Sequence, residues 1–191
     1  IGDLLGFPKG AIVNFALRKV KKMIPAYSLP GHVRFNDALD AGARGKLTPV
    51  DVGPQDVAFL QYTGGTTGVS KGATLTHRNL VANLAQIDAL ETHDLRAFVG
   101  VLPFFHIYGM VVIMMLGLAG GGTILVMPRF DMMEFLTYVQ KYRVTILPLV
   151  PPIVLGLVKH PAVAQFDLSS VRLTFSGAAP LGEEMARELA R

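Results

Sequence analysis

The chain has 191 residues, of which 51% are hydrophobic and 17% are charged, so it can bury a core and does not have a disordered composition. Eighteen basic residues against 14 acidic ones give a formal charge of +4, which is too small to indicate a nucleic-acid partner and suits phosphate-bearing ligands or a phospholipid surface. No cysteine is present, which excludes a disulfide framework, a thiol nucleophile and a cysteine-ligated metal site.

Residues 11–24 predict a basic amphipathic helix that stops at Pro25. Apolar side chains recur at helical spacing among the basic residues Arg18, Lys19, Lys21 and Lys22. Two interpretations stand: contact with a membrane interface, or a helix packed on the domain with its lysines in water. The turn-rich residues 37–55 predict a surface loop.

Residues 60–73 combine glycines, hydroxyls and a lysine between a strand-like approach and a helix-like exit. Glycines let backbone N–H groups approach an anion closely, and the hydroxyls and the ammonium add donors and charge, so we expect the phosphates of ATP here. The order differs from Walker A, which disfavours an ordinary P-loop NTPase. The alternative is a flexible surface turn. The candidate phosphate-binding residues are Thr63, Gly64, Gly65, Thr66, Thr67, Gly68 and Lys71, with Thr67 and Lys71 as catalytic candidates.

Strand-like and helix-like segments alternate from residue 57 onward, which predicts an α/β fold with parallel strand pairing and helical crossovers. The expected strands are 57–62, 98–102, 123–127, 144–149 and 171–176, and the expected helices are 79–90, 107–118, 132–142, 153–159 and 183–190. Residues 110–127 carry no charge, but Gly120, Gly121 and Gly122 break this stretch, so we interpret it as a buried αβ unit and not as a membrane span.

Ligands collect at the carboxyl ends of parallel strands, so the loops after the strands form the predicted site. His106 and Tyr108, beside two phenylalanines, suit a carboxylic acid with an apolar tail, although a purely structural histidine is the alternative. The small residues Gly177 and Ala178 let the backbone approach a flat ligand, or form a routine strand-to-helix turn. Arg129 offers a cation, or is a solvated arginine before a helix.

These motifs resemble those of the adenylate-forming (ANL) superfamily, which includes acyl-CoA synthetases, 4-coumarate-CoA ligases, luciferases and peptide-synthetase adenylation domains. Its phosphate-binding signature resembles residues 60–73. Residues 11–86 look like bacterial long-chain fatty-acid-CoA ligases, whereas residues 101–182 look more like the 4-coumarate ligase branch. The motifs that carry the second resemblance are Phe104-Phe105-His106-Ile107-Tyr108, Val150-Pro151-Pro152 and Ser176-Gly177-Ala178-Ala179-Pro180-Leu181.

The resemblance implies a mainly parallel α/β adenylation domain and a ligase that uses ATP, Mg²⁺ and coenzyme A to convert a fatty or related acid into an acyl-adenylate and then an acyl-CoA. In this comparison His106, Tyr108, Gly177 and Ala178 line the acid pocket, and Arg129 lies near the CoA nucleotide. The alternatives are a hydroxycinnamate ligase, another adenylate former such as an amino-acid-activating domain or a luciferase, and a fragment that binds only an acyl chain or a membrane surface.

The family's Tyr-Gly-x-Thr-Glu motif, ribose-binding aspartate, hinge and C-terminal lysine have no match in this sequence. We therefore expect residues 1–191 to be a partial N-terminal adenylation domain without its C-terminal partner domain. No metal ligand is assigned, because the Mg²⁺-binding glutamate of the family belongs to the unmatched motif. The expected location is the cytoplasm. The membrane interpretation of residues 11–24 would add peripheral contact with the inner face of the membrane.

Overall fold

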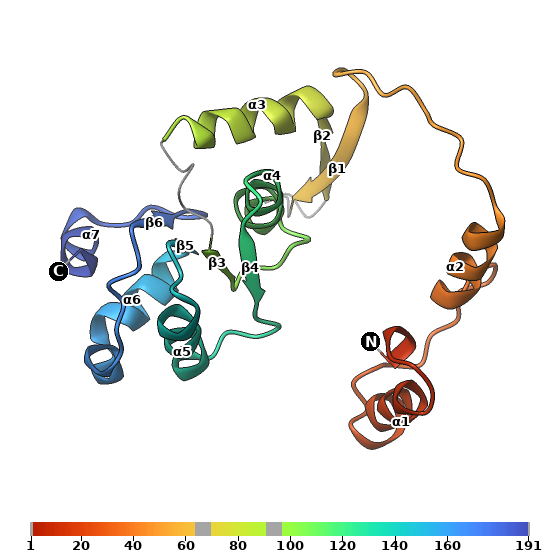
Figure 1. Cartoon of the computed structure of the whole chain (residues 1–191), viewed down its shortest axis with the longest axis horizontal. Helices are drawn as coiled ribbons and strands as arrows, with labels where there is room; N and C mark the ends of the chain where they lie inside the picture. Colours follow the sequence, from red (N-terminus) through yellow and green to blue (C-terminus); the bar gives the residue numbers. More distant parts are fainter. Residues whose placement is uncertain (1, 64–69, 91–96, 191) are drawn as a thin grey trace. The chain divides into compact units, whose positions relative to one another are not determined.

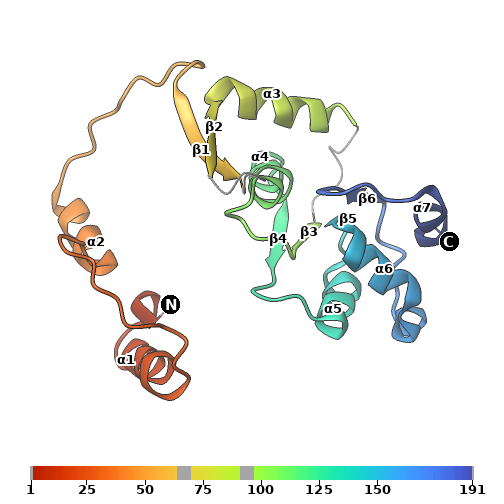
Figure 2. The same cartoon turned by 180° about the vertical axis from the view of Figure 1, so that it is seen from behind.

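The computed structural model describes residues 2–63, 70–90 and 97–190, and the chain divides into two compact units, residues 1–51 and residues 52–191 (Figures 1 and 2). The first unit contains short helical segments and the second contains all the described strands. None of the helices in the described ranges is both long and apolar enough to cross a membrane.

The first unit contains the predicted basic helix, with different bounds. It follows η1 (Gly2–Leu4), begins as α1 (Lys9–Phe15) and continues as η2 (Ala16–Val20), a stretch of π-helix. The helix ends before Pro25 because Lys22 adopts a left-handed φ of 48°, which helical backbone does not allow. Three of its apolar side chains are exposed: Ile12 by 64%, Phe15 by 63% and Val20 by 70%.

The prediction of a surface loop over residues 37–55 is wrong for its first part, where the structure has α2 (Phe35–Arg44). The segment holds three alanines and a leucine, which favour helix, and Asp37 lies in the first turn, where the helix dipole favours an acid. The helix ends at Gly45, and the whole segment is exposed, as expected of a surface region.

In the second unit, β1 (Val57–Thr63) and β2 (Lys71–Thr76) form an antiparallel two-stranded sheet. This corrects two predictions: the first expected strand does not join the parallel sheet, and the part of the motif that runs from Thr63 to Lys71, called here the Gly/Thr segment, leads into a strand before the next helix. The physical reason is length, since the segment between the two strands is far shorter than the dozen or so residues that a parallel crossover needs.

The helix that follows this hairpin, α3 (His77–Asp88), has a well-defined start. The Thr76 hydroxyl accepts a hydrogen bond from the Asn79 amide at 3.3 Å, and the Asn79 side chain accepts one from the Thr76 amide at 2.9 Å. This reciprocal capping box satisfies two backbone donors and explains why the helix begins two residues before the expected position.

The main sheet has four parallel strands in the order β4-β3-β5-β6. The strands are β3 (Ala97–Gly100), β4 (Thr123–Val126), β5 (Ile146–Leu149) and β6 (Leu173–Ser176). The helices after them are η3 (Gly109–Met115) continuing as α4 (Leu116–Ala119), α5 (Met132–Tyr142), α6 (Pro151–Lys159) with η4 (Pro161–Gln165), and α7 (Glu183–Leu189). The predicted parallel α/β arrangement is confirmed for these elements.

Side chains alternate between the two faces of this sheet. Val99, Leu147 and Leu149 pack into a core with Phe135, Leu136, Val139, Val154 and Leu157 from α5 and α6, to which α7 adds Met185 and Leu189. Phe98 and Ile146 point to the other face, where Ile113, Leu116, Leu84 and Ile87 from η3, α4 and α3 cover them. Figures 1 and 2 show α5 and α6 side by side on their face of the sheet. Because helices cover both faces of the sheet, a ligand can reach this sheet at the ends of its strands.

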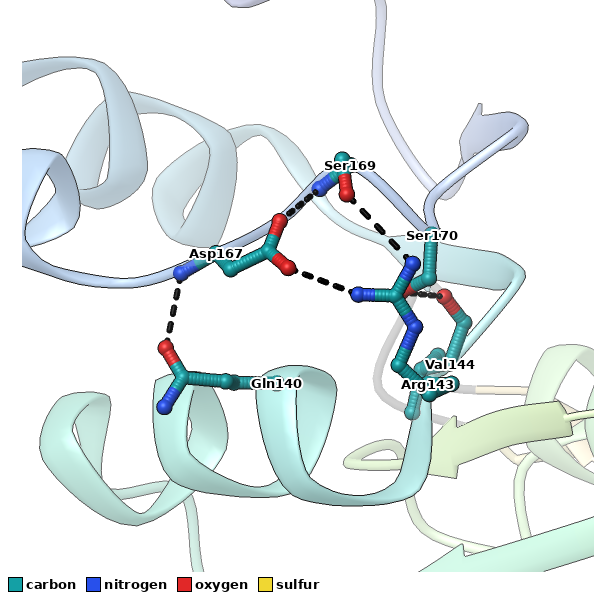
Figure 3. Close-up of polar contacts among 6 residues, drawn as sticks. All are labelled: Gln140, Arg143, Val144, Asp167, Ser169 and Ser170. Carbon is teal, nitrogen blue, oxygen red and sulfur yellow. Dashed lines mark hydrogen bonds and ion pairs between the residues drawn. The ribbon is translucent and has the colours of Figure 1, made fainter.

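A polar cluster lies before the amino-terminal ends of strands β5 and β6 (Figure 3). Arg143, which ends α5 with a φ of 52°, donates from Nη1 to Asp167 Oδ2 at 2.7 Å and from Nη2 to Ser169 Oγ at 3.4 Å. The Asp167 amide donates to Gln140 Oε1 at 2.7 Å, and the buried Ser170 hydroxyl donates to the Val144 carbonyl at 2.8 Å. These bonds join the end of α5 to the turn before β6.

Candidate active site

The ends of the predicted phosphate-binding segment lie opposite each other on the hairpin. Thr63 and Lys71 are partners in the last described rung of the β1–β2 ladder. The Thr63 hydroxyl donates to the Lys71 carbonyl at 3.4 Å, and the Ser70 hydroxyl donates to the Thr63 carbonyl at 3.4 Å. The side chains of Thr63 and Lys71 are exposed, and within the described ranges Lys71 forms no ion pair. The structure therefore leaves the ammonium available to an anion.

Five of the predicted phosphate-binding residues lie outside the described residues, so their roles remain predictions. They are Gly64, Gly65, Thr66, Thr67 and Gly68.

Tyr108 joins the carboxyl ends of two strands. Its hydroxyl lies 3.1 Å from the Leu149 carbonyl at the end of β5 and 3.3 Å from the Phe175 carbonyl in β6, so its single proton is shared between these two acceptors. Burial raises the pKa of Tyr108 from 10.0 to about 12, so the phenol is neutral at physiological pH. The hydroxyl is thus engaged with backbone acceptors, and the ring is the part of Tyr108 that remains for contact with a ligand.

Gly177 packs directly against this tyrosine. A Cβ atom at position 177 would lie 2.9 Å from Tyr108 Cε1 and 3.1 Å from Cζ, which is too close for any side chain without movement. The Gly177 amide donates to the same Leu149 carbonyl at 3.2 Å. The next residue, Ala178, has a φ of 67°, a left-handed conformation that is uncommon for a residue with a Cβ. The predicted acid-binding residues Tyr108 and Gly177 are therefore in contact.

His106 is exposed on the loop before η3. Its Nδ1 accepts a hydrogen bond from the Tyr108 amide at 3.2 Å, so Nε2 carries the proton of the neutral ring. The ring thus presents Nε2 as a donor, the chemistry that would orient a carboxylate.

Arg129 lies after β4, the strand at one edge of the sheet, while Tyr108 bridges β5 and β6 at the other side. It is exposed, and within the described ranges it forms no ion pair. Its neighbour Asp131 caps α5, accepting from the Glu134 amide at 3.0 Å. The structure does not bring Arg129 into contact with the acid-binding residues.

Sequence reasoning missed the partners of Tyr108, because a backbone carbonyl leaves no mark in the residue pattern. It also missed a groove of about 990 Å³ beside β6, lined by a mixture of mainly apolar and some charged side chains. The groove is lined by Leu157, Val163, Phe166, Leu173, Leu181 and Leu189, among others, and by neither Tyr108 nor Gly177.

In the parts of the chain that the structure describes, no three acidic or histidine side chains lie together as metal ligands.

Comparison with known proteins identifies the family. The sequence profile of the AMP-binding enzymes matches residues 9–191. The chain is 41% identical over 179 residues to 4-coumarate--CoA ligase 2 of Nicotiana tabacum, covering 91% of this chain and 33% of that enzyme. It is 47% identical over 145 residues to 4-coumarate--CoA ligase 1 of Petroselinum crispum, covering 73% of this chain and 27% of that enzyme. The chain thus spans about a third of the length of these relatives.

Solved structures agree with this assignment. ATP-bound MatB from Rhodopseudomonas palustris superposes with a TM-score of 0.71 at 32% identity, covering 81% of this chain and 31% of that one. The N-terminal domain of FACL13 from Mycobacterium tuberculosis superposes with a TM-score of 0.70 at 26% identity, covering 96% and 46% of the two chains. The resemblance that the Gly/Thr motif indicated is confirmed, and the chain belongs to the AMP-binding enzymes of the adenylate-forming superfamily.

Proposed function

We propose that residues 1–191 form part of the N-terminal adenylation domain of an ATP-dependent acid–CoA ligase. The family match over residues 9–191 supports this, as does the hairpin that sets Thr63 opposite Lys71 at the two ends of the Gly/Thr segment. The hairpin is the observation that carries the proposal, because it presents a hydroxyl and an ammonium that has no ion pair among the described residues, where the phosphate-binding sequence begins and ends.

The proposed reaction has two steps. A carboxylate oxygen of the acid attacks the α-phosphorus of ATP, and the bond between this phosphorus and the oxygen that bridges it to the β-phosphate breaks. Pyrophosphate departs, and the product is an acyl-adenylate. The sulfur of coenzyme A then attacks the carbonyl carbon, AMP leaves and the thiol proton is lost to solvent. Lys71 and Thr67 are proposed to stabilise the charge that gathers on the departing pyrophosphate, which is electrostatic catalysis without a protein nucleophile.

The acid is proposed to lie at the carboxyl end of β5 and β6. His106 Nε2 would donate to the carboxylate, the Tyr108 ring would form one wall, and Gly177 and Ala178 would set the space beside it. Arg129 is proposed to contact the nucleotide of coenzyme A. Mg²⁺ would neutralise phosphate charge, but the described residues offer no ligand cluster for it, so we assign it no ligand in this chain.

The nature of the acid is the finer part of the proposal. A fatty acid is suggested by the resemblance of residues 11–86 to long-chain fatty-acid-CoA ligases. A hydroxycinnamate is supported by the 4-coumarate–CoA ligases that match 73–91% of the chain, and by an aromatic wall that suits a flat acid. We therefore place a hydroxycinnamate-type acid first and a fatty acid second.

Acid-dependent ATP–pyrophosphate exchange in the full-length natural protein tests this function, with 4-coumarate, caffeate and fatty acids of several lengths as substrates. We expect exchange with at least one acid, and acyl-CoA formation when coenzyme A is added. The same assay on residues 1–191 alone should give no acyl-CoA, since the second step needs a closing C-terminal domain in this family. Exchange by no acid of the panel would contradict the proposed function and favour binding of an acyl chain or a membrane surface without catalysis.

We also propose a peripheral membrane contact through residues 11–24, at the inner face of the membrane of a cytoplasmic enzyme. The exposed apolar side chains of Ile12, Phe15 and Val20 stand beside Arg18 and Lys19 in one helical segment, a combination that favours anionic lipid surfaces. Co-sedimentation of the full-length protein with phosphatidylglycerol vesicles, but not with phosphatidylcholine vesicles, is the expected result. Equal binding to both, or to neither, would contradict it.

A further inference from the structure

Tyr62 and Gly72 lie opposite each other in the hairpin, one rung before its last described pair. A Cβ atom built on Gly72 would lie 3.3 Å from Cζ of Tyr62, 3.4 Å from Cε1 and 3.6 Å from Cε2. Three atoms of the ring are thus nearly equidistant from that point, so the ring lies flat over the glycine. The tyrosine is 62% exposed, so its ring takes this position without a buried core to hold it.

The next rung pairs Thr63 with Lys71, and its side-chain support is weak. The hydrogen bonds from the Thr63 hydroxyl to the Lys71 carbonyl and from the Ser70 hydroxyl to the Thr63 carbonyl are both 3.4 Å long, near the limit for such bonds. Because side chains alternate along a strand, Thr63 and Lys71 project on the face opposite the Tyr62 ring. The ring therefore lies on the face away from the Lys71 side chain.

A glycine inside a strand weakens pairing, because it brings conformational entropy and no side chain to pack. An aromatic side chain on the opposite strand can cover the glycine and restore a cross-strand contact. Tyr62 does this for Gly72 at the rung that precedes the Gly/Thr segment.

We propose that Tyr62 is a positioning residue. By packing on Gly72, it holds the register in which Thr63 faces Lys71, and so it keeps the Lys71 side chain where the phosphate-binding segment needs it. The statement that this register serves ATP binding rests on the proposed function. The statement that Tyr62 holds the register does not.

Three variants of the full-length natural protein test the inference. Tyr62→Ala removes the ring, Tyr62→Phe keeps the ring and loses only the hydroxyl, and Leu60→Ala removes a similarly exposed side chain from the same strand face, two residues further from the segment. Cross-strand aromatic contacts contribute up to about 1 kcal/mol, so Tyr62→Ala should raise the KM for ATP up to about fivefold. The KM for the acid should stay unchanged, and Tyr62→Phe and Leu60→Ala should behave as the wild type.

Amide hydrogen exchange gives a second readout that does not depend on activity. Hydrogen-bonded and non-hydrogen-bonded pairs alternate along an antiparallel ladder, so one of the two pairs Tyr62–Gly72 and Thr63–Lys71 has its amides bonded across the hairpin. Exchange at the amides of that pair should speed up in Tyr62→Ala and stay at the wild-type rate in Tyr62→Phe and Leu60→Ala. Unchanged exchange in Tyr62→Ala, or equal changes in all three variants, would overturn the inference. A wild-type protein without pyrophosphate exchange would contradict the proposed function instead, and hydrogen exchange would still decide whether Tyr62 holds the register.

Discussion

The Tyr108 ring and the Gly177 backbone are packed so closely that no side chain fits between them, since a Cβ on Gly177 would lie 2.9 Å from Tyr108 Cε1. The ring cannot easily withdraw, because its hydroxyl donates to the carbonyls of Leu149 and Phe175. The loop after β3 is thereby joined to the ends of β5 and β6, and these are the loops to which we assign the acid.

Gly177→Ala should destabilise the chain by about 1–3 kcal/mol, the usual cost of adding a methyl group to a close-packed contact. Gly182→Ala is the matched control, since nothing lies within 4 Å of a Cβ at that position. Urea denaturation of both variants measures the difference. Equal stability of the two variants would show that the Tyr108 ring moves aside freely.

Tyr108→Phe should flatten the dependence of stability on alkaline pH. The pKa of Tyr108 is about 12 in the folded chain and near 10.0 when unfolded, so between these values the unfolded chain has lost a proton that the folded chain keeps. This contribution to stability is therefore fully present below about pH 10 and is lost as the pH rises towards 12. Denaturation at several pH values above 9 should show this fall in the wild type and a shallower one in Tyr108→Phe. Parallel curves would contradict the assignment.

Asp167→Asn should weaken the chain at neutral pH more than at acid pH. The hydroxyl of Ser169, followed by its backbone amide and the Arg143 guanidinium, lowers the pKa of Asp167 below its ordinary 3.8. The stabilisation is present above the unfolded value and disappears as the pH falls through the lower folded value. Thermal denaturation at pH 7 and near pH 3 should show the gap between wild type and variant closing in acid. A constant gap would show that the charge of Asp167 contributes nothing.

Ala178→Trp should reduce activity with bulky acids while leaving the KM for ATP nearly unchanged, because the added side chain would fill the space beside the Tyr108 ring. Ala178→Gly controls for the backbone, since glycine adopts the φ of 67° without strain and should be as stable as the wild type or more so. Acid-dependent pyrophosphate exchange over short, long and aromatic acids measures both. An unchanged specificity profile in Ala178→Trp would remove Ala178 from the acid pocket.

The parallel part of the fold could be predicted from the sequence because helix and strand periods differ clearly there. The expected helix 132–142 matches α5 residue for residue, and Asp131 caps it. The hairpin could not be recognised in the same way, because Lys71–Thr76 is a short strand with two glycine or alanine positions and no apolar run, and it forms only by pairing with β1. Residue types predicted that Tyr108 and Gly177 belong to neighbouring loops, but the carbonyls that hold Tyr108 are invisible in a sequence.

Lys71→Ala tests the central proposal, that the hairpin presents a phosphate-binding lysine, most directly. Measured as acid-dependent ATP–pyrophosphate exchange in the full-length protein, this variant should lose about 10²–10³-fold in kcat/KM, the range seen when a charge-stabilising donor is removed. Lys159→Ala, which removes another exposed charge at the end of α6, should retain wild-type exchange. Exchange in Lys71→Ala at the wild-type rate, with both variants folded, would contradict the account.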